Sequence, residues 1–273
     1  MVDRLGKQED REGLATALNS DSRVSLLISF HGSLDYFLGR TQRQQPIRRA
    51  VDRKSSVKDV IESCGVPHPE VDLILADGQS VSFGFQILTS SRLDVFPFSA
   101  RPDPSSGLQE REIYSFVADG HLGKLTRDLR LLGIDVLYEN DARDQDLLAS
   151  VRLTGRALLT RDRRLLMHRI VKHGYFPRSQ EPFEQTVETI LRFELAPRLA
   201  PFTRCLRCNG SLHPATKESV LDKLQPLTKL YYNEFTRCAA CGGTYWHGSH
   251  MSELEKRVQN ILACISPNAA TPR

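Results

Sequence analysis

Two closely spaced cysteine pairs lie in the last third of the chain. Each pair has the pattern Cys-x-x-Cys, Cys205 with Cys208 and Cys238 with Cys241. Such a turn places two thiolates on one side of the backbone, and two turns complete the tetrahedral ligand shell of Zn²⁺. Redox-active pairs are the alternative, but two matched pairs favour a closed structural site. We expect these cysteines to bind Zn²⁺, which would supply much of the local folding energy.

Several aspartates follow strand-like segments at the positions where parallel strands end. Asp119 directly follows the apolar segment 113–118, and Asp162 follows a similar segment two predicted helices later. The carboxyl ends of parallel strands meet at one edge of a sheet, where ligands bind. Asp144 and Asp146, at the start of the intervening helix, reach the same edge.

Carboxylates clustered at one edge repel one another unless a cation lies between them. Mg²⁺ or Mn²⁺ takes oxygen ligands and usually keeps several waters, so two or three aspartates suffice. Such an ion activates water and stabilises the leaving oxygen in phosphodiester cleavage. Taken singly, Asp162 is explained as a helix N-cap, and Asp144 and Asp146 as charges that complement a helix dipole. Asp119 and Asp162 together favour a catalytic role.

Basic residues near these aspartates are candidates for contacts with a phosphate backbone. The candidate RNA-binding residues are Lys124, Arg127, Arg161, Arg163, Arg164 and His250. A solvated helix face is the alternative for each arginine. The segment 120–126 resembles a phosphate-binding loop, but its two glycines are too close together for that motif.

The elements that position these residues fall into distinct regions. Residues 22–98 read as two strands, a helix at about 56–62 and three more strands, including one over 81–85. After the Pro- and Ser-rich linker, strands and helices alternate, which is typical of a parallel sheet covered by helices. We expect helices over 182–195 and 252–264. The predicted boundaries are a polar tail 1–21, a domain 22–98, a linker 99–112, an α/β domain 113–200, a cysteine module 201–250 and a helix and tail 251–273.

The bulk composition excludes several classes of protein. The 273 residues include 37 basic and 33 acidic side chains, a net charge of +4 that lies within residues 201–273. No segment approaches the ~18 apolar residues of a membrane span, and the N-terminus lacks a signal-peptide pattern. We expect a soluble, cytoplasmic protein with no membrane partner. Cys64 and Cys264, which are unpaired in sequence, are expected to be buried.

Four motifs together resemble a known nuclease family. They are Phe116-Val117-Ala118-Asp119-Gly120-His121-Leu122-Gly123-Lys124-Leu125, Leu129-Arg130-Leu131-Leu132-Gly133-Ile134-Asp135, Leu158-Leu159-Thr160-Arg161-Asp162-Arg163, and the two cysteine pairs with Tyr245-Trp246-His247-Gly248-Ser249-His250. This pattern, over about residues 113–258, is similar to the PIN-like ribonuclease domain with a zinc ribbon, which also occurs at the C-terminus of an animal RNase D-type exonuclease. The resemblance implies metal-dependent RNA cleavage through Asp119, an acid at Asp144 or Asp146, and Asp162. Arg163 and Arg164 stand where such sites often carry another acid.

The first domain resembles the ubiquitin-like β-grasp domain that accompanies this nuclease in prokaryotic proteins. The matching stretch runs from Ser56 to Val71. Relatives of this domain include sulfur carriers with a free C-terminal Gly-Gly. Here the chain continues from Val95-Phe96-Pro97-Phe98 into the linker, so carrier chemistry is excluded for this domain.

The predicted fold class is therefore a ubiquitin-like β-grasp domain followed by a three-layer α/β domain with an appended four-cysteine zinc ribbon. The predicted function is a Mg²⁺- or Mn²⁺-dependent ribonuclease whose basic zinc ribbon helps to seat RNA beside the acidic edge. The alternative is a non-catalytic adaptor that binds RNA or the ribosome. A third possibility is a protein-interaction module, with partners bound by the β-grasp domain. The RNA substrate and the oligomeric state are left open.

Overall fold

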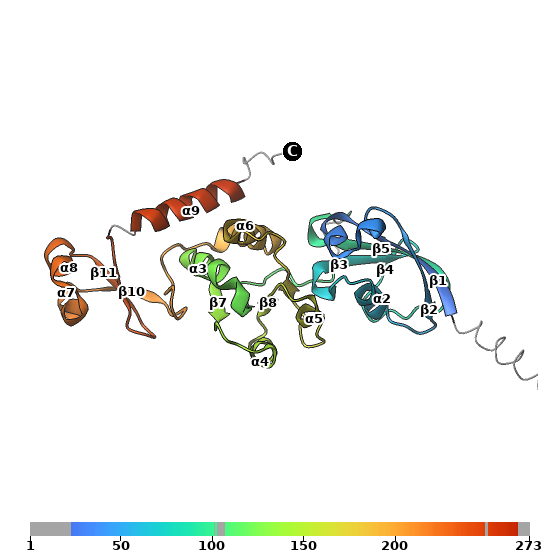
Figure 1. The fold of residues 1–273 in the computed structure, drawn as a ribbon, viewed down its shortest axis with the longest axis horizontal. Helices are drawn as coiled ribbons and strands as arrows, with labels where there is room; N and C mark the ends of the chain where they lie inside the picture. The colour runs from blue at the N-terminus through green and yellow to red at the C-terminus, as the bar shows by residue number, and fades with distance from the viewer. Residues whose placement is uncertain (1–22, 101, 103–106, 249–250, 267–273) are drawn as a thin grey trace, which may run out of the picture. The chain divides into compact units, whose positions relative to one another are not determined.

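The computed structural model describes residues 23–100, 102, 107–248 and 251–266 (Figure 1). The predicted tail 1–21 and the candidate His250 lie outside these residues. The chain divides into two compact units, 1–109 and 110–273, and each is described by itself.

The first unit is a β-grasp domain built on a mixed sheet of five strands. The strands are β1 (Arg23–Phe30), β2 (Ile47–Asp52), β3 (Val71–Ala76), β4 (Gln79–Ser80) and β5 (Ser91–Pro97). Their order is β2-β1-β5-β3-β4, with β1 parallel to β5 and the other pairs antiparallel. Buried and exposed residues alternate along β1, so that one face of the sheet is apolar. Helix α2 (Val57–Ser63), capped by the Ser56 hydroxyl, buries Val57, Val60 and Ile61.

Residues 81–85 do not form the predicted strand. The Phe83 and Phe85 carbonyls instead accept hydrogen bonds from the Lys58 and Val57 N–H groups in the first turn of α2. The first turn of a helix has N–H groups without intrahelical partners. This segment satisfies two of them and is therefore diverted from the sheet.

The second unit begins with a parallel α/β domain. Its strands are β6 (Ser115–Ala118), β7 (Asp135–Tyr138), β8 (Ala157–Leu159) and β9 (Gly174–Tyr175), in the order β7-β6-β8-β9. The helices are α3 (Gly123–Leu131), α4 (Asp144–Thr154), α5 (Arg163–Leu166) and α6 (Pro182–Arg192). Phe116 and Ala118 face a core with α3 and α6, and α4 lies on the opposite side of the sheet (Figure 1). Helix α6 ends at Arg192 rather than at residue 195, and Glu194 then adopts a φ of 51°.

The four-cysteine module follows and contains three antiparallel strands. These are β10 (Leu212–Ala215), β11 (Phe235–Cys238) and β12 (Thr244–Trp246). Two short helices, α7 (Lys217–Val220) and α8 (Pro226–Tyr231), connect β10 to β11. The terminal helix α9 (Met251–Ile265) packs on α6 and on the α/β core through Val258 and Ile261.

The two cysteines outside the Cys-x-x-Cys pairs differ in burial. Cys64 is buried as expected, but Cys264 is exposed; the buried residues of α9 are Val258 and Ile261. In the described part of the chain, the helices are too short or too polar to cross a membrane.

Candidate active site and metal centre

Asp119 lies at the carboxyl end of the central strand β6. The Asp119 N–H donates to the Leu159 carbonyl on the neighbouring strand, which fixes the backbone at this edge. Its carboxylate Oδ2 accepts a hydrogen bond of 2.7 Å from the Thr160 hydroxyl. Thr160 is fully buried and Asp119 is half-buried, so the Asp119 carboxylate is held in one orientation.

Asp162 is joined to the same threonine. Its N–H donates to Thr160 Oγ1 over 2.9 Å, so that one hydroxyl contacts both residues. The exposed Asp162 side chain caps α5, with Oδ1 accepting from Arg164 N at 2.7 Å and Leu165 N at 3.1 Å. The N-cap interpretation of Asp162 is therefore confirmed. Both capping bonds go to the same carboxylate oxygen, Oδ1.

The two glycines of the segment 120–126 allow close packing at this edge. A Cβ on Gly120 would lie 2.4 Å from the Asn140 carbonyl oxygen, and a Cβ on Gly123 would lie 2.6 Å from the Tyr138 hydroxyl. The Tyr138 hydroxyl donates to the Gly120 carbonyl at 2.9 Å. The loop after β7 is thereby held against the residue that follows Asp119, and it leads into α4.

Asp144 and Asp146 lie in the first turn of α4 and are both exposed. Asp146 is paired with Arg143, whose Nε donates to Oδ2 over 3.0 Å. The Arg143 hydrogen bond holds the pKa of Asp146 below its usual range. Among the described residues, the four cysteines are the one group of three or more potential ligands within 4.8 Å of one another. The structure therefore does not gather Asp119, Asp144, Asp146 and Asp162 into such a group.

The four cysteine sulfurs converge at the base of the ribbon. Cys205 Sγ lies 3.7 Å from Cys241 Sγ, and Cys208 Sγ lies 3.4 Å from Cys238 Sγ. All four are free thiols within 4.8 Å of one another. A tetrahedral Zn²⁺ with sulfurs at 2.3 Å requires S–S separations of about 3.8 Å, so the four side chains fit this ion.

The cysteine thiols differ in acidity. Burial alone would raise the pKa of Cys205, but hydrogen bonds from the Tyr245 hydroxyl and from backbone N–H groups lower this pKa to about 6. A backbone N–H of Gly210 would lower the pKa of Cys208, but burial and the neighbouring thiols raise that pKa to about 12. Like charges at this spacing disfavour full ionisation without a cation, and a bound Zn²⁺ removes that penalty.

Comparison with protein families finds a match over most of the second unit. Residues 114–258 match the Mut7-C RNAse domain. The chain belongs to the Mut7-C RNAse domain family. Residues 24–103 match the Mut7-C ubiquitin domain, in agreement with the β-grasp fold of the first unit. No curated protein matches the chain.

The candidate RNA-contact residues of this Mut7-C RNAse domain occupy two places. Lys124 and Arg127 are exposed on α3 and line a cavity of 240 Å³ with Phe183 of α6 and Arg257 of α9. Arg161 lies over the Phe176 ring and donates to the Ser179 carbonyl, so it stiffens the loop before α6. Arg163 and Arg164 begin α5 beside Asp162, and the Arg164 side chain is exposed.

The ribbon attaches at the amino ends of the parallel strands, whereas Asp119 and Asp162 lie at their carboxyl ends. Buried Arg130 donates to the Val136 carbonyl and, at 3.0 Å, to the Arg207 carbonyl of the first Cys-x-x-Cys turn. Asn209 accepts from the Val136 N–H and donates to Asp135 Oδ1 at 2.6 Å. Asp135 begins β7, whereas Asp119 follows the last residue of the adjacent parallel strand. The first cysteine turn therefore packs at the end of the strands opposite to the acids, and not beside them as the sequence suggests.

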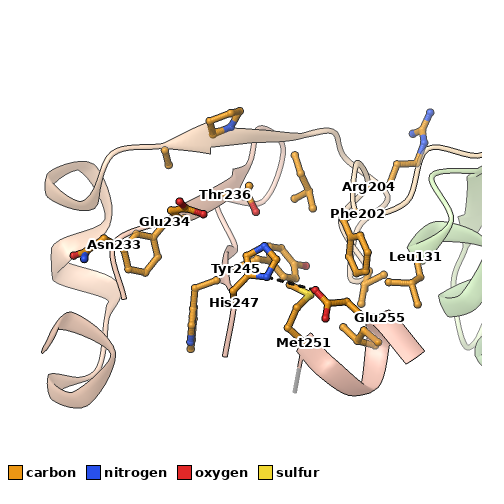
Figure 2. Close-up of a pocket in the computed structure, with 17 residues that line it drawn as sticks. Leu131, Phe202, Arg204, Asn233, Glu234, Thr236, Tyr245, His247, Met251 and Glu255 are labelled. Carbon is orange, nitrogen blue, oxygen red and sulfur yellow. Dashed lines mark ion pairs between the residues drawn. The ribbon is translucent and has the colours of Figure 1, made fainter. Parts of the chain in front are cut away.

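The aromatic residues after the second cysteine pair line a cavity of 490 Å³ between the ribbon and α9 (Figure 2). Trp246 packs on the small core of Val220, Leu224 and Phe235. His247 and Glu255 form an ion pair at 3.6 Å across the cavity (Figure 2). Packing thus accounts for Trp246, while the Tyr245 hydroxyl lies 3.0 Å from Cys205 Sγ in the cysteine cluster.

Sequence reasoning missed Thr160, Arg130 and Asn209. Each is an ordinary polar residue whose role depends on a distant partner. The available clue in the sequence was proximity to a candidate residue. Thr160 lies two residues before Asp162, and Asn209 directly follows Cys208.

Proposed function

We propose that the chain is a metal-dependent ribonuclease that cleaves RNA phosphodiester bonds at the carboxyl edge of the parallel sheet. The observation that carries this proposal is the hydrogen-bonded series Asp119–Thr160–Asp162, in a chain of the Mut7-C RNAse domain family. It orients two carboxylate residues from adjacent strands, as a PIN-like nuclease site requires.

Asp119 and Asp162 would hold a Mg²⁺ or Mn²⁺ ion, with Asp144 assisting from α4. Such an ion supplies Lewis-acid stabilisation and an activated water in phosphodiester cleavage. Asp146 is partly neutralised by Arg143, so we assign it the lesser role. Thr160 positions Asp119, and the exposed Lys124, Arg127 and Arg164 would contact phosphates.

Zn²⁺ would occupy the four cysteines as a structural ion. The Sγ separations of 3.4 and 3.7 Å support this assignment. The site offers four protein ligands and no open position, which is typical of structural and not catalytic zinc.

The test is cleavage of a labelled RNA by the full chain with added Mn²⁺. Asp119→Asn and Asp162→Asn should each lower the rate by at least about a hundredfold, because each removes an anionic ligand. Asp222→Asn is the matched control, since Asp222 is an exposed carboxylate of the ribbon. Equal rates for Asp119→Asn and Asp222→Asn would contradict the proposal.

A second candidate is an adaptor that binds RNA without cutting it. The Arg143–Asp146 pair and the arginines beside Asp162 favour it, because they reduce the negative charge available to a cation. Salt-dependent RNA binding without any product in Mn²⁺ would select this function.

A further inference from the structure

The β-grasp unit has a markedly uneven distribution of charge. Residues 40–54 contain six basic side chains and one acidic side chain, a net charge of +5. The remaining residues of 23–100 contain three basic and seven acidic side chains, a net charge of −4. The near-neutral total of this region therefore conceals one strongly basic segment.

This basic segment follows one edge of the sheet. Strand β2 is the edge strand next to β1, and it exposes Arg48 on the face opposite to α2. The short helix η2 (Arg40–Gln42) and the loop before β2 add Arg40 and Arg43, both exposed. At the other end of β2 lie Arg53 and Lys54, also exposed. Strand β2 itself, from Ile47 to Asp52, spans about 17 Å.

Most of this charge is not cancelled locally. Asp52, the acid within the segment, pairs with Arg23 of β1 at 3.2 Å. Within the part of the chain that the structure describes, Arg40 and Arg48 have no carboxylate partner. Arg43 donates to the Leu38 carbonyl and Arg49 to the Ser63 hydroxyl, so these two cations are held in place while their charges are retained.

Charged residues on an edge strand also prevent strand-to-strand aggregation. That explanation covers Arg48 and Arg49, which lie on β2. It does not cover Arg40 and Arg43, which precede the strand, or Arg53 and Lys54, which follow it. A row of arginines longer than the strand fits an extended polyanion, because guanidinium groups match phosphate oxygens.

We infer that the basic edge of the β-grasp unit, formed by Arg40, Arg43, Arg48, Arg49, Arg53 and Lys54, binds the phosphate backbone of single-stranded RNA. This inference rests on the proposed function for the identity of the polyanion. The β-grasp unit thereby contributes RNA affinity that is independent of base sequence, and the catalytic edge belongs to the other unit.

The test is fluorescence anisotropy with a labelled single-stranded RNA of mixed sequence. The full zinc-loaded chain carries Asp119→Asn to prevent cleavage. The test variant Arg40→Gln with Arg48→Gln removes two positive charges from the basic edge. The control variant Gln79→Glu with Ser80→Glu adds two negative charges on exposed β4, at the opposite edge of the same sheet. Both variants change the net charge by the same amount.

Loss of two phosphate contacts should weaken binding about tenfold at 0.15 M salt and reduce the slope of log K against log salt by about 1.4. The control should change affinity by less than about twofold. Equal effects of the two variants, or equal displacement of RNA by poly-glutamate, would overturn the inference. If the unmodified chain cleaves RNA but the arginine variant binds RNA as tightly as its parent, the basic edge is refuted and the proposed nuclease is not. Edge-dependent binding without cleavage would refute the proposed nuclease alone.

Discussion

Thr160 has no charge, yet its hydroxyl contacts both of the aspartates that we place at the catalytic edge. It donates to Asp119 Oδ2 and accepts from the Asp162 N–H, and it is fully buried. A group that orients a carboxylate in this way influences metal affinity even though it does not touch the ion.

Thr160→Val keeps the shape of the side chain and removes the hydroxyl. We expect the rate of RNA cleavage in Mn²⁺ to fall by about 10–100-fold, with a higher Mn²⁺ requirement. Thr160→Ser keeps the hydroxyl and should recover most of the rate. If Thr160→Val and Thr160→Ser have the same Mn²⁺ dependence, then Thr160 has no positioning role.

Asp135 is a titratable residue that links the start of β7 to the ribbon. Burial alone would raise its pKa, but hydrogen bonds from Arg156 and Asn209 and the charge of Arg204 hold that pKa below its usual range. A lowered pKa stabilises the folded state above the unfolded value of about 3.9, and this stability is lost as pH falls through the folded pKa.

Asp135→Asn should therefore lower the free energy of unfolding by about 2 kcal/mol at pH 7, as expected for hydrogen bonds to a charged group. The difference from the parent chain should shrink below about pH 4. Urea unfolding at a series of pH values measures it. A difference that is constant from pH 7 to pH 3 would show that the Asp135 charge is not responsible.

At the scale of elements, α3 connects the two chemical centres. Its N-terminal end follows Asp119, and its Arg130 near the C-terminal end holds the backbone of the first cysteine turn. The ribbon has a small core of its own, Val220, Leu224 and Phe235. A core of this size is small for the module, so we expect its folding to depend on a bound metal and on the contacts with α3 and β7.

Removal of zinc should therefore unfold the ribbon and spare the parallel sheet. Trp246 is the single tryptophan of the chain and lies in β12, so its fluorescence reports on the ribbon. A strong chelator, or Cys205→Ser with Cys238→Ser, should shift the Trp246 emission to longer wavelength while most far-ultraviolet circular dichroism remains. Cys264→Ser, which removes an exposed thiol outside the cluster, is the control and should leave emission and zinc content unchanged. An unshifted emission after complete zinc loss would contradict a structural role for the ion.

The elements also show how far sequence reasoning extends. Leu122, Leu125, Leu129 and Leu132 are buried in or next to α3, and their spacing alone indicates a helix, because apolar periodicity is a local property. The cysteine cluster is likewise predicted by its spacing. Residues 81–85 and the placement of the ribbon were predicted wrongly, because the partners of these segments, the first turn of α2 and the start of β7, are remote in sequence.

At the scale of the whole molecule, the net charge of +4 gives little information about where an RNA would bind. The sequence locates the excess in residues 201–273, but the structure reveals a more concentrated basic segment along β2, within a region of low net charge. Charge acts locally at physiological ionic strength, where the screening length is ≈ 8 Å. Segment totals therefore missed a feature that the strand order makes visible.

The most direct test of the central claim is single-turnover cleavage of a labelled RNA, measured against Mn²⁺ concentration for the parent chain, Asp119→Asn and Asp222→Asn. The account predicts saturable, Mn²⁺-dependent product formation for the parent and for Asp222→Asn, and almost none for Asp119→Asn. Product formation that is independent of Mn²⁺, or that persists unchanged in Asp119→Asn, would contradict the assignment of the catalytic edge.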